Sequence, residues 1–183
     1  MALSKIDAAN FLTGTIPDTN INNASLDNVT GLPAGVGGKV LQVVRTYNAD
    51  TGHIATSNTS FTASGIQATI TPTASSNLII VDFTTTMSAV DDSGNTMEAK
   101  MYQKTGSGSF AQMSGAGFYH LAFTRYTASQ YLPVAFGGSY TTTNTDTLVF
   151  EPYFKSDVSS QTVRLCHTGS SYSLTVMEIS TWL

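Results

Sequence analysis

The chain has 183 residues and a mass of 19.4 kDa, enough for one domain with a substantial core but short for two. Charged residues make up 11% of it and the formal net charge is −4, so there is no basic field to bind nucleic acid or an anionic membrane. Hydrophobic residues make up 41%, and Ser, Thr, Asn and Gly stand where charges usually do, which favours strands and turns.

The start of the chain, MALSKIDAANFL, contains no apolar stretch typical of a secretory signal. The apolar run LIIV at residues 78–81 is far too short to span a bilayer. The single cysteine, Cys166, cannot form an internal disulfide. We therefore expect a protein made in the cytoplasm, without membrane insertion, that is held together by packing or by association.

The N-terminal segment has an apolar residue at every fifth position. The row consists of Ile6, Phe11, Ile16, Ile21 and Leu26. A helix repeats every 3.6 residues and a strand every two, so neither gives this row a constant face. Three interpretations stay open: a solenoid that resembles pentapeptide repeats, an irregular arm, and an extended arm that buries the row against other chains. We favour the extended arm, because the few units form a single coil with no neighbour to stack on.

The stretch GLPAGVGGK at residues 31–39 contains four glycines and a proline, which indicates a hinge. We place the domain boundary there. Residues 1–34 are predicted to be an extended arm for assembly or anchoring, and residues 35–183 a β-sandwich domain.

Short segments rich in β-branched and aromatic residues, bounded by turn residues, follow the hinge. They are residues 39–47, 65–71, 77–87, 96–104, 122–126, 130–136, 146–155, 161–167 and 171–180. Residues 96–104 could also form a helix, but we interpret them as a strand because Met97, Ala99 and Met101 alternate with polar neighbours. The prediction is an all-β fold, with the extended arm followed by an antiparallel sandwich of jelly-roll type.

No arrangement of residues in the sequence is typical of catalysis. His53, His120 and His167 belong to no recognisable motif, and Cys166 next to His167 would point to the opposite face of a strand, so we interpret Cys166 as a small core residue. The stretch DDSGN at residues 91–95 lacks the pattern of a calcium loop and is predicted to be a hairpin turn. We expect no catalytic residue, cofactor or metal.

Two segments rich in Gly, Ser and Thr, beginning at residues 105 and 136, are predicted to be long loops. Their aromatic residues are Phe110, Phe118, Tyr119 and Tyr140. Aromatic rings among hydroxyl groups suit contact with a glycan or a protein surface. The alternative is that these rings fill the core or an interface between subunits, and both interpretations stay open.

Several stretches resemble small fibre-type structural proteins of tailed bacteriophages. They are LTGTIP, NVTGLP followed by GGKVLQVVRTYNADT, SGIQATITPTASSNLIIVDFTTTM and SYSLTVMEIS, and the resemblance spans most of the chain. In those proteins a polar arm leads into a GKVLQVV strand, a hairpin containing ITP follows, and a strand ending in MEI closes the chain. The resemblance implies a homotrimer whose β-domains pack about a threefold axis while the arm anchors it to the particle.

The implied function is that of a virion protein: a short fibre on the tail or the head that presents its β-domain to a glycan or protein of the host surface. Its implied partners are other virion proteins, such as a tail adaptor, the baseplate or the capsid. The chain is too short for the attachment domain and shaft of a full tail fibre. The alternative is a capsid decoration or cement protein that stabilises the head without binding a receptor.

Overall fold

The computed structural model describes residues 39–49, 52–90, 96–114, 120–124, 131–166 and 169–180, with the backbone alone for residues 120–124. The chain divides between Gly37 and Gly38 into two units, and all described residues belong to the second. The predicted arm with its apolar row beginning at Ile6 lies outside the described residues, as do Phe118 and Tyr119.

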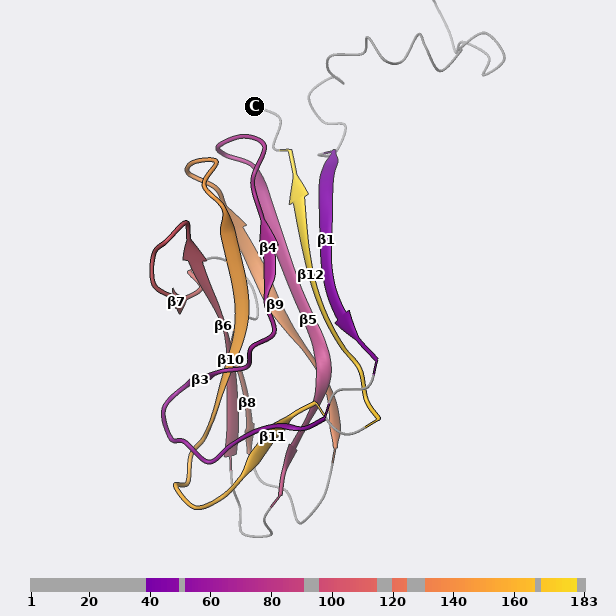
Figure 1. Cartoon of the computed structure of the whole chain (residues 1–183), viewed down its shortest axis with the longest axis vertical. Coiled ribbons are helices and arrows are strands. Elements are labelled where there is room, and N and C mark those ends of the chain that lie inside the picture. Colours follow the sequence, from indigo (N-terminus) through magenta and orange to yellow (C-terminus); the bar gives the residue numbers. More distant parts are fainter. Residues whose placement is uncertain are drawn as a thin grey trace, which may run out of the picture. The chain divides into compact units, whose positions relative to one another are not determined.

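All regular elements of the described residues are strands, and they form two antiparallel sheets (Figure 1). The strands are β1 (Val40–Asn48), β2 (Ile54–Thr56), β3 (Thr62–Ala63), β4 (Ala68–Ile70), β5 (Leu78–Ala89), β6 (Thr96–Thr105), β7 (Ala111–Gln112), β8 (His120–Thr124), β9 (Leu132–Thr141), β10 (Leu148–Ser156), β11 (Val163–Leu165) and β12 (Tyr172–Ile179). The predicted all-β sandwich is confirmed. Across these ranges, no helix is long and apolar enough to cross a membrane.

The first sheet, sheet A, is centred on β5. On one edge of β5, β9 pairs from Leu132 to Thr141. On the other edge, β12 pairs with residues 78–84 and β11 with residues 87–89, so β11 and β12 lie in line. Beyond them β1 pairs with β12 and β2 with β11. Sheet A is therefore four strands wide, with two of its four positions each occupied by a pair of strands in line.

The second sheet, sheet B, repeats this plan around β6 and β10. These two strands pair along their whole length, from Leu148 opposite Thr105 to Ser156 opposite Met97. On the far side of β10, β3 and β4 lie in line, and on the far side of β6, β7 and β8 do the same. Sheet B is therefore also four strands wide.

When each pair of strands in line is counted as one, the described chain contains eight strands in a jelly-roll order. The pairs counted as one strand are β1 with β2, β3 with β4, β7 with β8, and β11 with β12. Numbered from 1 to 8 along the chain, the eight strands have the order 1-8-3-6 in sheet A and 2-7-4-5 in sheet B. This is the order of a double-sheet jelly roll, and it confirms the predicted fold. The expected hairpin that contains ITP at residues 70–72 is wrong, because β4 and β5 belong to different sheets. The turn expected at residues 91–95 lies outside the described residues, but the strands on either side of it, β5 and β6, also belong to different sheets and form no hairpin. Turn residues indicate that a chain reverses but carry no information on which sheet the next strand joins.

The loop predicted from residue 136 is also wrong in its first part, because β9 continues to Thr141. Gly137 and Gly138 pair there with Asp82 and Val81 of β5. A Cβ atom on Gly137 would overlap the backbone carbonyl of Val81. The two glycines thus permit a close approach of two strands, where the sequence indicated a break.

The core lies between the sheets and is built from alternate residues of their strands. In β5, Val81 and Phe83 are buried, and the rings of Phe83 and Phe136 meet edge to face with centres 5.4 Å apart. Cys166 is also buried, and its Sγ lies 3.1 Å from Oγ1 of Thr85. The interpretation of Cys166 as a small core residue is confirmed.

A buried carboxylate, that of Glu178 in β12, links sheet A to the segment that connects β4 with β5. Its Oε1 accepts hydrogen bonds from the backbone N of Thr73 at 2.7 Å, from the Thr73 hydroxyl at 2.9 Å and from Nδ2 of Asn77 at 2.6 Å. Its Oε2 accepts one from Nε2 of Gln42 at 2.6 Å. Burial raises the pKa of Glu178, but these hydrogen bonds outweigh burial and lower the pKa overall.

Candidate functional site

Exposed apolar side chains line β1, an edge strand of sheet A. They are Val40, Leu41, Val43 and Tyr47, which are 51%, 36%, 56% and 53% exposed, and we call them the β1 patch. Val40 and Leu41 are consecutive, at an irregularity in the pairing of β1 with β12. Inward-facing residues separate Leu41, Val43 and Tyr47; for example, the Thr46 hydroxyl donates a 2.7 Å hydrogen bond to the backbone oxygen of Gln67. Because the large hydrophobic residues exposed in the described ranges number six, four of them on one strand form a concentration that needs an explanation.

The apolar surface continues from the β1 patch across two further strands. The register places Val43 opposite Met177 of β12, and Met177 opposite Ile80 of β5. The half-buried side chains that extend the patch are Leu78, Ile80, Met177 and Ile179. The outer face of sheet A therefore carries an apolar band that crosses β1, β12 and β5.

Two opposite charges accompany this band. Arg45 of β1 and Asp82 of β5 lie in one row, on either side of Thr175 of β12. The Arg45 guanidinium donates from Nε to Oγ of Ser173 at 2.7 Å and lies 4.7 Å from the centre of the Tyr47 ring. Asp82 is exposed. A face with one cation and one anion can meet a second copy of itself with opposite charges matched.

The outer face of sheet B carries a row of four aromatic rings. Tyr102 of β6 and Tyr153 of β10 stack with ring centres 4.1 Å apart and an interplanar angle of 21°. Phe61 lies 6.1 Å from Tyr102, and Phe110 lies 5.8 Å from Tyr153. Because Tyr153 pairs with Lys100, the two tyrosines are diagonal neighbours across adjacent strands. We call Phe61, Tyr102, Phe110 and Tyr153 the aromatic face.

Three lysines lie over the two outer rings of the aromatic face. The ammonium groups of Lys100 and Lys155 are 4.9 Å and 5.4 Å from the centre of the Phe61 ring. That of Lys104 is 4.9 Å from the centre of the Phe110 ring. All three distances are within the range of about 6 Å in which a ring attracts a cation. Since the whole chain has eight Lys and Arg residues, the aromatic face gathers a large share of its positive charge.

The carboxylates next to the aromatic face already have partners. Glu98 forms a salt bridge with Lys155 at 3.1 Å. Glu151 is buried, and its two oxygens accept hydrogen bonds from the backbone N of Gly65 and from Nε2 of Gln67, each at 2.7 Å. Both carboxylates of this surface are therefore engaged within the protein.

The remaining polar groups of the aromatic face can all donate a hydrogen bond. Burial raises the pKa of Tyr153 above its ordinary value of 10.0, and the charges of Glu151 and Tyr102 raise it further, so its phenol keeps the O–H at neutral pH. Lys100 donates from Nζ to Oε1 of Gln112 at 3.2 Å. An ammonium carries three hydrogens, so it keeps donors to offer to a ligand.

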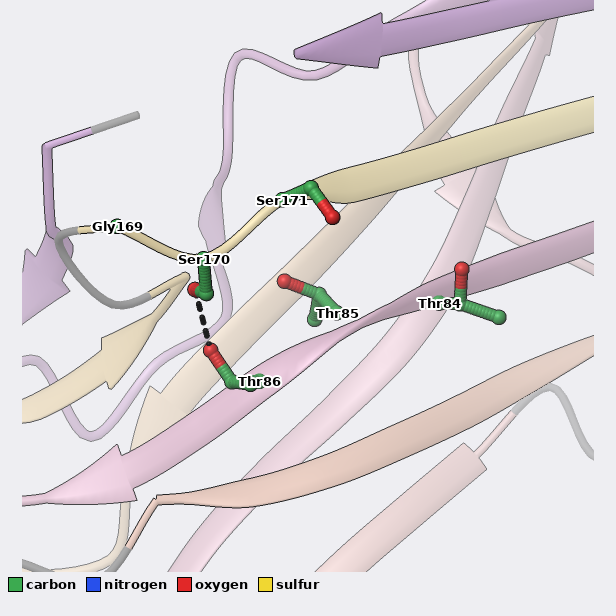
Figure 2. A pocket seen from close by; sticks show the side chains of 6 residues that line it. All are labelled: Thr84, Thr85, Thr86, Gly169, Ser170 and Ser171. Atoms are coloured by element: carbon green, nitrogen blue, oxygen red, sulfur yellow. Dashed lines mark hydrogen bonds between the residues drawn. The ribbon is translucent and has the colours of Figure 1, made fainter. Parts of the chain in front are cut away.

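A hydroxyl-lined depression of about 370 Å³ opens beside the gap between β11 and β12 (Figure 2). Its lining residues are Thr84, Thr85, Thr86, Gly169, Ser170 and Ser171. The hydroxyls of Thr86 and Ser170 lie 2.8 Å apart and form a hydrogen bond. Residues 167–168, which precede Gly169 in the sequence, lie outside the described ranges, and we assign the depression no ligand.

The structure separates the aromatic residues that the sequence singled out. Phe110 belongs to the aromatic face, just before β7. Tyr140 lies in β9 opposite Ile79 and is half-buried against the core, so it forms no part of an exposed loop. Phe118 and Tyr119 lie outside the described residues.

Sequence reasoning missed Phe61, Tyr102 and Tyr153. A signal was present, because an aromatic residue and lysines alternate on one side of the predicted strands, as Lys100, Tyr102 and Lys104 and again as Tyr153 and Lys155. The proximity of these two strands follows only from the pairing of β6 with β10.

His53 directly precedes β2 and Cys166 directly follows β11, at the end of the ladder where Ile54 pairs with Leu165. His53 is exposed, whereas Cys166 is buried. In the part of the chain that the structure describes, no three His, Cys, Asp or Glu side chains gather to hold a metal ion.

Strand order and pairing define the class of this protein as an antiparallel jelly-roll sandwich. Comparison with protein families and with curated proteins finds no match to the sequence. Among solved structures, Eiger TNF from S. frugiperda is similar with 8% identity and a TM-score of 0.49 over 79% of this chain and 96% of that one. Two other solved structures are similar with lower TM-scores.

The structure of infectious bursal disease virus, Gx strain, is 12% identical with a TM-score of 0.37, over 77% of this chain and 41% of that one. The CBM22-1 xylan-binding domain from Paenibacillus barcinonensis is 13% identical with a TM-score of 0.34, over 80% of this chain and 98% of that one.

Proposed function

We propose that the chain is a structural protein of a tailed-bacteriophage particle, a short fibre assembled from several copies, with no catalytic role. Three observations support the proposal. Residues 37–51, 64–87 and 171–180 resemble fibre-type virion proteins, and the jelly-roll order is one that capsid and lectin domains use. The observation that carries the proposal is the β1 patch, because a fibre must associate with copies of itself.

The β1 patch is costly for a protein that stays alone in water. More than half of the surface of Val40, Val43 and Tyr47 is exposed on an edge strand, where unpaired backbone groups also invite association. Full burial of such a side chain contributes about 1.5 to 3 kcal/mol, so covering the patch and its half-buried neighbours would stabilise an assembly by several such increments.

The occupant we propose for the apolar band is a second copy of this chain. Arg45 and Asp82 give the band opposite charges at separate positions, so two copies can bring unlike charges together. In a ring of three copies the contact is heterologous, so the Arg45 side of the band in one copy would meet the Asp82 side of the next. Three copies is the number that the resemblance to fibre-type proteins implies.

Light scattering of the purified full-length chain tests the assembly. We expect a trimer for the natural chain and a shift to monomers for Val43→Glu, which places an unpaired charge in the band. Val158→Glu is the matched control, because Val158 is 37% exposed but lies outside the β1 patch. A monomeric natural chain, or a trimer that Val43→Glu leaves intact, would contradict the proposal.

Particles assembled without this chain distinguish the fibre from its alternative, a capsid decoration protein. Loss of adsorption to the host supports the fibre. Loss of resistance to heat or osmotic shock, with adsorption unchanged, supports decoration. Absence of the chain from purified particles would exclude both.

A further inference from the structure

We infer that the aromatic face is a binding site for acidic polysaccharide, with Lys100, Lys104 and the phenol of Tyr153 contacting carboxylate or phosphate groups on the sugars. This inference deepens the proposed function by naming a ligand class for the face that a fibre would present. It rests on the proposed function in one respect, namely that the polysaccharide belongs to the host surface.

The charge of the aromatic face favours an anionic ligand. Lys100, Lys104 and Lys155 gather over its rings, while Glu98 is neutralised by Lys155 and Glu151 is buried with both oxygens engaged. Three lysines against the carboxylates of Glu98 and Glu151 leave this surface with an excess of one positive charge, on a chain whose net charge is −4. Such complementarity selects ligands of opposite charge and increases their association rate.

The hydrogen-bonding groups of the face point to the same ligand class. A neutral sugar hydroxyl both donates and accepts, so a site for neutral glycans offers donors and acceptors together. Here the carboxylates are engaged, the ammonium groups that remain are donors only, and the protonated phenol of Tyr153 has an O–H to donate. Carboxylate and phosphate groups on sugars are acceptors and match that set, and charge-assisted hydrogen bonds are the stronger kind.

The ring geometry favours sugars over nucleic-acid bases. Bases bind by stacking on open ring faces. Tyr102 and Tyr153 already stack on each other, and the two phenylalanines are flanked by lysines. The tyrosines also present their ring edges, whose hydrogens carry partial positive charge, and their hydroxyl groups. Those features suit the hydroxyl-bearing and acidic edges of a sugar chain.

Calorimetric titration of the full chain with oligogalacturonate tests binding of sugar carboxylates. Titration with phosphorylated mannan tests binding of sugar phosphates. The methyl ester of oligogalacturonate is the matched neutral ligand, since it keeps the sugars and removes the charge. We expect binding to at least one acidic ligand, at least tenfold weaker binding of the neutral counterpart, and weaker binding at high salt.

Lys104→Gln removes one charge from the face and should weaken acidic-ligand binding about fivefold. Lys39→Gln removes the same charge from the start of β1 and should leave binding unchanged. The inference is overturned if neither acidic ligand binds, if the methyl ester binds equally well, if the two lysine variants behave alike, or if a single-stranded oligonucleotide binds as tightly as the acidic sugars.

Binding should persist in Val43→Glu, because the aromatic face and the β1 patch lie on different sheets. A monomeric protein that still binds acidic sugar would contradict the proposed assembly alone. A trimer that binds none would contradict this inference alone.

Discussion

Gln42 of β1 donates a 2.6 Å hydrogen bond from Nε2 to Oε2 of Glu178, its direct partner on β12. The same Nε2 donates at 2.7 Å to the backbone oxygen of Thr71, which leads from sheet B toward β5. Glu178 is fully buried, and the donors that surround it belong to neutral groups. The fold thus holds a carboxylate in its interior with amide, hydroxyl and backbone donors.

Replacing Glu178 with Gln should destabilise the domain. The new amide would direct hydrogens at some of the donors that now bond to the carboxylate, and buried donors would lose their partners. We expect the free energy of unfolding in urea to fall by about 2 kcal/mol. Glu98→Gln, which breaks a partly exposed salt bridge, is the control and should cost less than about 1 kcal/mol. Equal losses in the free energy of unfolding for the two variants would show that the buried hydrogen bonds of Glu178 stabilise the domain no more than an exposed salt bridge does.

The stability of the domain should depend on pH through the same residue. The pKa of Glu178 is lower in the folded chain than its ordinary value of 4.5, so the unfolded chain takes up the proton first. The stability that the carboxylate contributes is present above about pH 4.5 and is lost as the pH falls through the lower folded pKa. Urea unfolding between neutral and acidic pH should show this decline, with a smaller one in Glu178→Gln. The same decline with pH in the natural chain and in Glu178→Gln would contradict this role of Glu178.

Gly137→Ala should destabilise β9, because the added Cβ would overlap the carbonyl oxygen of Val81 in the partner strand. Overpacking of this kind typically costs about 1 to 3 kcal/mol, measurable as a lower thermal midpoint. Gly52→Ala is the control, since a Cβ there meets no atom within 4 Å. A thermal midpoint of Gly137→Ala at or above that of Gly52→Ala would contradict the close approach of β9 to β5.

Cys166 should react with a thiol reagent only when the domain unfolds. Its side chain is 1% exposed, and its Sγ lies against the hydroxyl of Thr85. A coloured disulfide exchange reagent should therefore label the native chain very slowly and the urea-unfolded chain at once. Rapid labelling of the native chain would mean that this part of the core opens readily.

The strands with a buried face were predictable from the sequence. The segment predicted at residues 77–87 is observed as β5 (Leu78–Ala89), and that at residues 96–104 as β6 (Thr96–Thr105). In both, apolar residues alternate because one side packs in the core and the other faces outward. The same alternation decided the ambiguous case of residues 96–104 correctly in favour of a strand.

What could not be predicted depends on partners distant in the sequence. Gly137 indicated a loop because nothing in its neighbourhood shows that β5 approaches it from the side. The stacking of Tyr102 on Tyr153 follows from the register of β6 with β10, which no local pattern contains. The aromatic face could therefore be predicted strand by strand but not as one surface.

The backbone N of Lys39 donates to the Ser180 hydroxyl at 3.2 Å, and the backbone N of Ser180 donates to the oxygen of Lys39 at 2.9 Å. The chain therefore enters β1 beside the end of β12, and the two strands run antiparallel from there. A force that pulls Lys39 along β1, while the far end of the sandwich is held, loads the hydrogen bonds between these strands in shear, all at once. A force that draws Lys39 away from Ser180 would instead peel them apart one pair at a time. The domain is thus mechanically strongest when it is tethered through Lys39 and loaded at its opposite end.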